Sequence, residues 1–255
     1  MVKVRNVEML GLESSIVASA YPALKRAYNE EEFKQKKKEV HNILFNDDIE
    51  EQTDWATKRV NRAKLLGSVP QGTAHDNFLK GIVVQFDITY PVYWSPQFQR
   101  YHFADIVSST SSMYTLTKID LNESMNEFTI PEIKEQLINM IDIYNDALLQ
   151  GNKTVAKIIK YGSMRKIETI RFSSRIKGIM KLPEETIIEI PIEDLYMHII
   201  SNCPQGLEKT MRVSTNYLQL KTMYLQRKNH KLYDWKEFVK WIETLPYFKE
   251  LTGVE

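Results

Sequence analysis

Three polar side chains of different chemistry stand close together near the middle of the chain. Arg100 and Tyr101 follow Gln97 by three and four positions, so a helix here would put an amide, a guanidinium and a phenol on one face. A hydroxyl-rich loop is predicted to follow at 108–112. Because a guanidinium and hydroxyl donors together bind oxyanions, the pattern predicts an anion site. An ordinary helix with a solvated polar face is the alternative.

A second group of candidates stands in the last quarter of the chain. Residues 212–227 are predicted to be helical, which would place Asn216 and Arg227 on one face, 227 − 216 = 11 positions apart. His230 follows them. His75, in the loop before the central strand, is an isolated candidate for which a structural histidine is the alternative.

No pattern in the sequence is typical of a protein nucleophile or a metal centre. Cys203 is the single cysteine, which excludes an internal disulfide framework and a cysteine-rich metal site. There is also no Ser-His-Asp or Cys-His signature. We therefore predict no catalytic side chain and no metal ligand.

The elements that position these residues follow from periodicity. Residues 82–90 alternate between apolar and polar, which is typical of a half-buried strand, and Pro91 ends it. Ser95 and Pro96 indicate a helix start directly afterwards. Further strands are predicted at 2–9 and 185–192, and further helices at 12–21, 30–46, 48–66, 131–149, 193–201 and 235–245.

Composition sets limits on the class of protein. The chain has 255 residues, 43% hydrophobic and 26% charged, as in globular proteins. The net charge of +1 argues against a protein that binds nucleic acid or membranes through its overall positive charge. No apolar run reaches the roughly 18 residues of a membrane helix, and no signal peptide is visible, so a cytoplasmic location is predicted.

The central stretch resembles a motif of the flavin-dependent thymidylate synthases, G-H-x-x-P-F-E-H, then a strand ending in Pro, then Q-x-x-R-H-R-x-x-S-x-N-E-x-S-x-R-Y. His75 falls on the first histidine, Pro91 on the proline, and Gln97 and Arg100 on the glutamine and first arginine. Ser111 keeps a serine. The chain departs from the motif at several positions: Lys80 and Gly81 replace Glu-His, Tyr101 and His102 replace His-Arg, Ser108 and Ser109 replace Asn-Glu, and Met113 replaces the last arginine.

Two later segments extend the resemblance. Asn216 and Arg227 keep the family's spacing and His230 comes one position early, but Leu218 stands where the family has arginine. Residues 152–192 depart from the family, and Ile179 takes the place of its substrate-binding arginine. This segment is basic, so Arg171 or Arg175 is a candidate substitute, with a charged strand edge as the alternative.

The resemblance implies an α+β fold with an antiparallel sheet flanked by helices, as one domain over 1–255. Residues 29–66 would form a helical segment and 152–192 an insertion-like basic segment. Such enzymes reductively methylate dUMP in nucleotide biosynthesis, using FAD, NADPH and methylene-tetrahydrofolate. They are homotetramers whose active sites are shared between subunits.

By resemblance, the nucleotide contacts would be Gln97, Arg100, Ser111 and Arg227, and the flavin contacts would be His75, Tyr101, Asn216 and His230. Three interpretations remain open. The chain is a divergent flavin-dependent methyltransferase that acts at C5 of a pyrimidine nucleotide, or an inactive relative that binds a nucleotide, flavin or protein partner. The third is an unrelated α+β domain.

Overall fold

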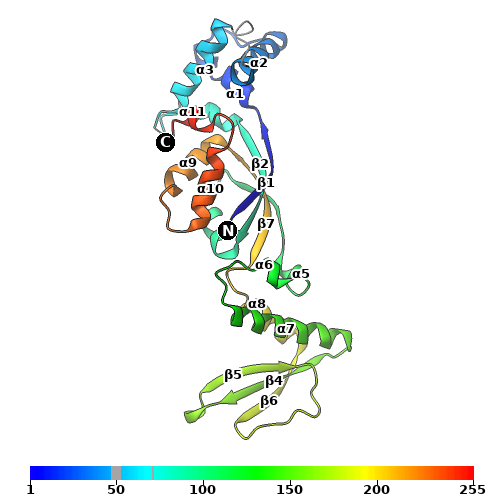
Figure 1. Cartoon of the computed structure of the whole chain (residues 1–255). Helices are drawn as coiled ribbons and strands as arrows, with labels where there is room; N and C mark the ends of the chain where they lie inside the picture. The colour runs from blue at the N-terminus through cyan, green and yellow to red at the C-terminus, as the bar shows by residue number, and fades with distance from the viewer. Residues whose placement is uncertain (47–52, 71) are drawn as a thin grey trace. The chain divides into compact units, whose positions relative to one another are not determined.

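The structure is a computed structural model that describes residues 1–46, 53–70 and 72–255. Its chain divides into two compact units (Figure 1). Unit 1 comprises Met1–Tyr90, Trp94–Ser109 and Thr210–Glu255, and unit 2 comprises Pro91–Tyr93 and Thr110–Lys209.

A four-stranded sheet organises unit 1, in the order β1 (Lys3–Leu10), β2 (Val83–Pro91), β7 (Glu208–Asn216), β3 (Asp105–Ser109). β1 pairs antiparallel with β2, and β3 pairs antiparallel with β7. The central strand follows its predicted alternation, because Val84, Phe86 and Ile88 are fully buried while the residues between them are half-exposed. The predicted strand and its end at Pro91 are therefore confirmed.

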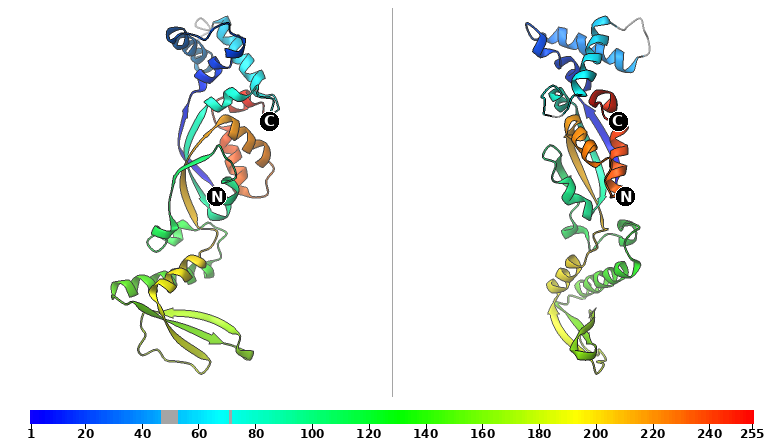
Figure 2. Two further views of the ribbon diagram at one scale, coloured as in Figure 1. Left: turned by 180° about the vertical axis from the view of Figure 1, so that it is seen from behind. Right: turned by 90° about the vertical axis from the view of Figure 1, so that its left-hand side faces the viewer.

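Helices α9 (Tyr217–Arg227) and α10 (Tyr233–Glu243) lie against one face of this sheet (Figures 1 and 2). The ring of Phe86 on β2 lies 5.9 Å from that of Phe238 and 4.5 Å from that of Trp241. Trp94 packs 4.7 Å from Trp235, measured between ring centroids. Burial of these large rings makes the aromatic face of α10 part of the core of unit 1.

The N-terminal helices lie where β1 ends and β2 begins (Figure 1). They are α1 (Leu12–Ala18), η1 (Tyr21–Ala23), α2 (Glu30–Phe45), α3 (Asp54–Gly67) and η3 (Asn77–Gly81). The C-terminal helix α11 (Phe248–Thr252) packs against α3. Asn29 and Glu32 form a capping box at the start of α2. Gly11 has φ 84°, and a Cβ there would lie 2.3 Å from the carbonyl oxygen of Gly81, so α1 packs on η3 only with glycine at this position.

Unit 2 is a small α+β layer. Its sheet has the order β5 (Ile167–Ser173), β4 (Thr154–Tyr161), β6 (Glu185–Pro191), with both neighbours antiparallel to β4. Helices α7 (Pro131–Leu149) and α8 (Ile192–Ser201) cover one face (Figure 1). Shorter elements are α5 (Ser112–Thr115), α6 (Leu121–Ser124) and η5 (Ser163–Arg165). Residues 152–192 thus form a folded sheet.

Three expectations about local structure were wrong. Residues 208–216 form β7, because Met211, Val213 and Thr215 are buried at a period of two between β2 and β3, and only α9 is helical. The helix after Pro91 is shorter than predicted: η4 (Val92–Trp94) leads into α4 (Ser95–Phe98), and turns follow it. The hydroxyl run is not a loop, since it is divided between the end of β3 and the start of α5.

The predicted helix at 48–66 is described only in part. The start of the predicted helix 48–66, residues 48–52, lies outside the described residues, and the rest is α3. Among the described residues, no helix combines the length and apolar character needed to cross a bilayer.

Candidate functional site

A half-buried arginine at the end of α9 gathers four side chains of unit 1, which we call the Arg227 cluster: Gln97, Tyr101, His230 and Trp235. Nε of Arg227 donates to the Tyr101 hydroxyl at 2.7 Å, and its Nη1 donates to Oε1 of Gln97 at 3.4 Å. Its guanidinium carbon lies 4.6 Å from the centre of the Trp235 ring. The indole N–H of Trp235 donates to the same Gln97 oxygen at 2.9 Å.

The partners of Arg227 are all neutral, and no carboxylate within residues 1–46, 53–70 or 72–255 forms an ion pair with it. Neutral acceptors and ring faces orient a guanidinium and leave its positive charge uncompensated. An anionic or electron-rich oxygen is therefore the ligand that this arrangement favours.

His230 borders the cluster in its neutral form. Loss of water around the ring, followed by the positive charge of Arg227, lowers the pKa of His230 below its usual value. The backbone N–H of Leu232 donates to Nδ1 of His230 at 3.1 Å. The neutral ring therefore carries its proton on Nε2 and offers a hydrogen-bond donor there.

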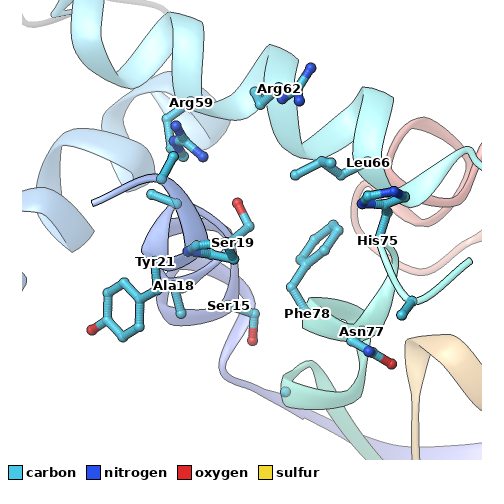
Figure 3. Close-up of a pocket in the computed structure, with 15 residues that line it drawn as sticks. Ser15, Ala18, Ser19, Tyr21, Arg59, Arg62, Leu66, His75, Asn77 and Phe78 are labelled. Carbon is cyan, nitrogen blue, oxygen red and sulfur yellow. The ribbon is translucent and has the colours of Figure 1, made fainter. Parts of the chain in front are cut away.

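The α1–α3 pocket is a cavity of about 680 Å³ between α1, α3 and the loop that leads into η3 (Figure 3). Small and hydroxyl residues of α1 form one wall, including Ser15, Ala18 and Ser19. Arg59 and Arg62 come from α3. The remaining lining is His75, Asn77, Phe78, Leu66, Tyr21, Pro22, Ala20, Ala23, Ala74 and Gly81. The volume is in the range of pockets that hold cofactors.

A second cavity of about 680 Å³, the α9 pocket, shares Ala74 and Asn77 with the first. Asn216 lines it as the N-cap of α9, where its side-chain oxygen accepts from the backbone N–H of Gln219 at 2.9 Å. Lys80, Asp76, Gly72, Phe103, Leu218, Gln219 and Thr222 complete the lining. The loop 72–77 therefore separates two neighbouring cavities.

A buried ion pair fixes this loop. Nζ of Lys221, on α9, lies 3.2 Å from Oδ2 of Asp76, and both side chains are at most 4% exposed. The same ammonium donates to the carbonyl oxygens of Gly67 at 2.7 Å and Val69 at 2.8 Å. One lysine thus joins α9, the end of α3 and the loop residue next to His75.

The predicted site residues fall into three groups. Gln97, Tyr101, Arg227 and His230 meet in the Arg227 cluster, while His75 lines the α1–α3 pocket and Asn216 the α9 pocket. Arg100 is exposed and has no ion pair or hydrogen bond with a side chain of the described residues. Ser111 is the N-cap of α5 and belongs to unit 2. Their roles toward ligands stay predictions.

Sequence reasoning missed the two arginines of α3. A sequence signal was present, because positions three and four before and after Arg59 and Arg62 carry no acidic residue. Trp235 was not among the predicted site residues, and its N–H contact with Gln97 links the aromatic core to the cluster. Arg171 forms an ion pair with the buried carboxylate of Glu185 in unit 2. Across the part of the chain that the structure describes, no group of His, Cys, Asp and Glu could hold a metal.

Comparison with solved structures decides the fold. The chain matches a flavin-dependent thymidylate synthase ThyX from Helicobacter pylori, complexed with FAD and dUMP, with a TM-score of 0.52 over 98% of this chain and 96% of that chain. The chain has the flavin-dependent thymidylate synthase fold. A second ThyX structure from Helicobacter pylori, also with FAD and dUMP, gives a TM-score of 0.53 over 98% and 95%.

The thymidylate synthase fold is also shared with the UMP/dUMP methylase PolB from Streptomyces cacaoi, bound with 5-Br dUMP, which matches with a TM-score of 0.51 over 99% of this chain and 95% of that chain. Sequence identity is 12% to both ThyX structures and 9% to PolB, so these likenesses establish the fold alone. No protein-family model and no curated protein sequence matches the chain. The predicted α+β fold with flanking helices is confirmed.

Proposed function

We propose that the chain is an FAD-dependent enzyme that modifies C5 of a pyrimidine nucleotide of the dUMP type, by reductive methylation or a related reaction. The observation that carries this proposal is the Arg227 cluster, an oriented cation without an anionic partner among the described residues. It lies in a fold whose similar solved structures contain dUMP or 5-Br dUMP.

In this proposal the Arg227 cluster holds the nucleotide. Arg227 donates to a phosphate or to a uracil oxygen that becomes electron-rich during the reaction, while Gln97 and Tyr101 keep the guanidinium in place. Arg100, exposed after α4, supplies a second charged contact. Ser111, which belongs to unit 2, stays a nucleotide contact predicted from the family resemblance alone.

The α1–α3 pocket suits a flavin nucleotide. Small side chains of α1 and the ring of Phe78 provide an apolar wall for a flat ring system, and His75, Ser19 and Asn77 offer polar groups at its edge. Asn216 would contact the cofactor from the neighbouring α9 pocket. Tyr101 and His230 would approach it from the Arg227 cluster.

FAD, when bound, supplies the redox chemistry, with NADPH as reductant and methylene-tetrahydrofolate as carbon donor. The chain itself binds and orients the reactants. The donor on Nε2 of His230 and the cation of Arg227 would stabilise negative charge near the reacting ring. No protein nucleophile is required by this assignment.

A specific observation favours a second candidate function, an inactive protein that keeps nucleotide or flavin binding. Two donors of Arg227 are already used by Tyr101 and Gln97. Positions of two family arginines carry Met113 and Ile179. Because each lost hydrogen bond to a charged ligand costs about 1.5–3 kcal/mol, turnover would be lost before binding is.

Absorption and ligand binding separate the two candidates. We expect the purified protein to carry a flavin absorbance that is released on denaturation, and dUMP to raise its melting temperature, because a ligand selective for the native state stabilises it. Formation of a C5-methylated product from dUMP then supports the enzyme, and binding without product supports the inactive alternative. Absence of both FAD and dUMP binding contradicts the whole proposal.

The Arg227→Gln variant tests the cluster directly. It should weaken dUMP binding about tenfold or more, since one charged hydrogen bond is lost. Lys228→Gln, the neighbouring exposed residue, is the matched control and should bind dUMP normally. Equal dUMP affinity in both variants would contradict the nucleotide role of Arg227.

The wider assembly belongs to the same proposal. We expect a cytoplasmic homotetramer in which sites are shared between subunits, which light scattering would test. We also expect residues 1–255 to behave as one domain, with a single cooperative unfolding transition seen by different probes.

A further inference from the structure

The two arginines of α3 have no role in the family pattern, and no side-chain hydrogen bond or ion pair joins either of them to another described residue. Nε of Arg59 is buried and has no hydrogen-bond partner among residues 1–46, 53–70 and 72–255. Within the described residues, no carboxylate forms an ion pair with Arg59 or Arg62. A buried N–H donor without an acceptor lowers the stability of the folded protein, so an acceptor atom of a bound ligand would satisfy it.

The charges of the two arginines reinforce each other. They lie three positions apart on α3, on one side of the helix. Burial lowers the pKa of Arg59. The nearby Tyr28 acts in the opposite direction, and the positive charge of Arg62 adds to the lowering. Two adjacent guanidinium groups that form no ion pair with a described carboxylate create a local positive field at the pocket wall.

Their placement in the cavity is specific. Figure 3 shows Arg59 extending from α3 toward α1, whereas the side chain of Arg62 points away from α1 on the outer side of the helix. The opposite part of the cavity is formed by Leu66, Phe78 and His75. The pocket is therefore cationic at one end and largely apolar at the other.

We infer that the α1–α3 pocket binds the diphosphate group of a nucleotide cofactor through Arg59, with Arg62 as a second, exposed contact. A diphosphate provides several oxygens for two guanidinium groups. This inference rests on the proposed function, because it assigns a diphosphate contact to the pocket proposed for FAD.

Binding of FAD, ADP and inorganic pyrophosphate to wild type and to Arg59→Gln/Arg62→Gln tests the inference, by thermal shift and calorimetry at fixed ionic strength. The double variant should lose affinity for each diphosphate about 10- to 100-fold. Lys58→Gln/Lys64→Gln removes two charges from the same helix outside the pocket and should bind as wild type. Without ligand, the double variant should melt at the wild-type temperature or above, because a repulsive pair is removed.

The outcomes are distinguishable. If wild type binds FAD and the Arg59→Gln/Arg62→Gln variant binds it equally well, the diphosphate role is overturned and the flavin proposal stands. If wild type binds ADP or pyrophosphate in an arginine-dependent way without binding FAD, the inference stands and the flavin proposal fails. If wild type binds none of the three, both are wrong. If the variant unfolds without ligand, Arg59→Met replaces it, because methionine keeps an apolar stem and removes the charge. Reduced affinity of Arg59→Met for the diphosphates supports the inference, and wild-type affinity overturns it.

Discussion

Lys221→Met is the substitution whose effect the structure defines best. Methionine keeps an unbranched apolar stem and removes the ammonium that lies 3.2 Å from Oδ2 of Asp76. The carboxylate would then be buried without a counter-charge, and the carbonyls of Gly67 and Val69 would each lose a donor. Removal of one partner of a buried pair costs about 3–5 kcal/mol.

We therefore expect the free energy of unfolding to fall by about 3–5 kcal/mol, a large part of the roughly 5–15 kcal/mol that stabilises a folded protein. Urea unfolding followed by circular dichroism measures this as a lower midpoint with an unchanged slope. Lys240→Met is the matched control, because its pair with Glu237 is a surface pair with a lysine side chain 70% exposed. It should cost about 1 kcal/mol or less.

A double-mutant cycle decides the mechanism. Lys221→Met combined with Asp76→Asn removes both charges, so the double variant should be more stable than Lys221→Met alone by at least about 1 kcal/mol. Because Asp76 lies beside His75 and Asn77, Lys221→Met should also weaken ligand binding in both pockets. A loss below about 1 kcal/mol for Lys221→Met, or simple additivity in the cycle, would refute the role of the pair in fixing the loop.

Three further predictions concern pH and packing. Burial, then the hydrogen bond to Glu243 and the charge of Glu243, raises the pKa of Tyr224 to about 12. The contribution of Tyr224 to the free energy of unfolding should therefore be complete below pH 10, the ordinary pKa of tyrosine, and should fall from there toward pH 12. Urea unfolding at a series of pH values should show a shallower fall in Tyr224→Phe than in wild type, and an equal fall would contradict this assignment. Arg227→Gln should raise the pKa of His230 by removing a positive neighbour, which NMR of the imidazole protons would detect; no change would exclude their coupling. Gly11→Ala should lower the free energy of unfolding by about 2–5 kcal/mol, because the backbone is left-handed there and the new Cβ would meet the carbonyl of Gly81. Gly72 also has a positive φ, but a Cβ there would meet no atom within 4 Å. Gly72→Ala should therefore cost only about 1–2 kcal/mol, measured by urea or thermal unfolding.

Local periodicity in the sequence was sufficient for several elements. The alternation of 82–90 identified the central strand, because a strand with one buried face needs apolar residues at every second position. The spacing of apolar residues identified α7 and α10 in the same way, through the period of the helix. The order of these elements, with His75, Pro91 and Gln97 at fixed places, was enough to predict the fold.

Residues 208–216 show where the sequence alone misleads. Their polar and apolar residues fit a helical face as well as a strand, and the pairing of β7 with its neighbours β2 and β3 selects the strand. Asn216 therefore caps α9 and does not share a helical face with Arg227. Strand pairing depends on partners that are distant in the sequence, so no local pattern contains it.

The sequence by itself determined several elements, among them β2, α7 and α10, together with the fold class and the chemical types of the candidate residues. Only the tertiary structure decided which of them meet: Tyr101 and Arg227 are 126 positions apart, and Asp76 and Lys221 are 145 apart. It also turned Arg59 and Arg62 from surface charges into the wall of a cavity. The physical reason is that periodicity encodes which face of an element is buried, whereas the contacts of a site depend on how separate elements pack together.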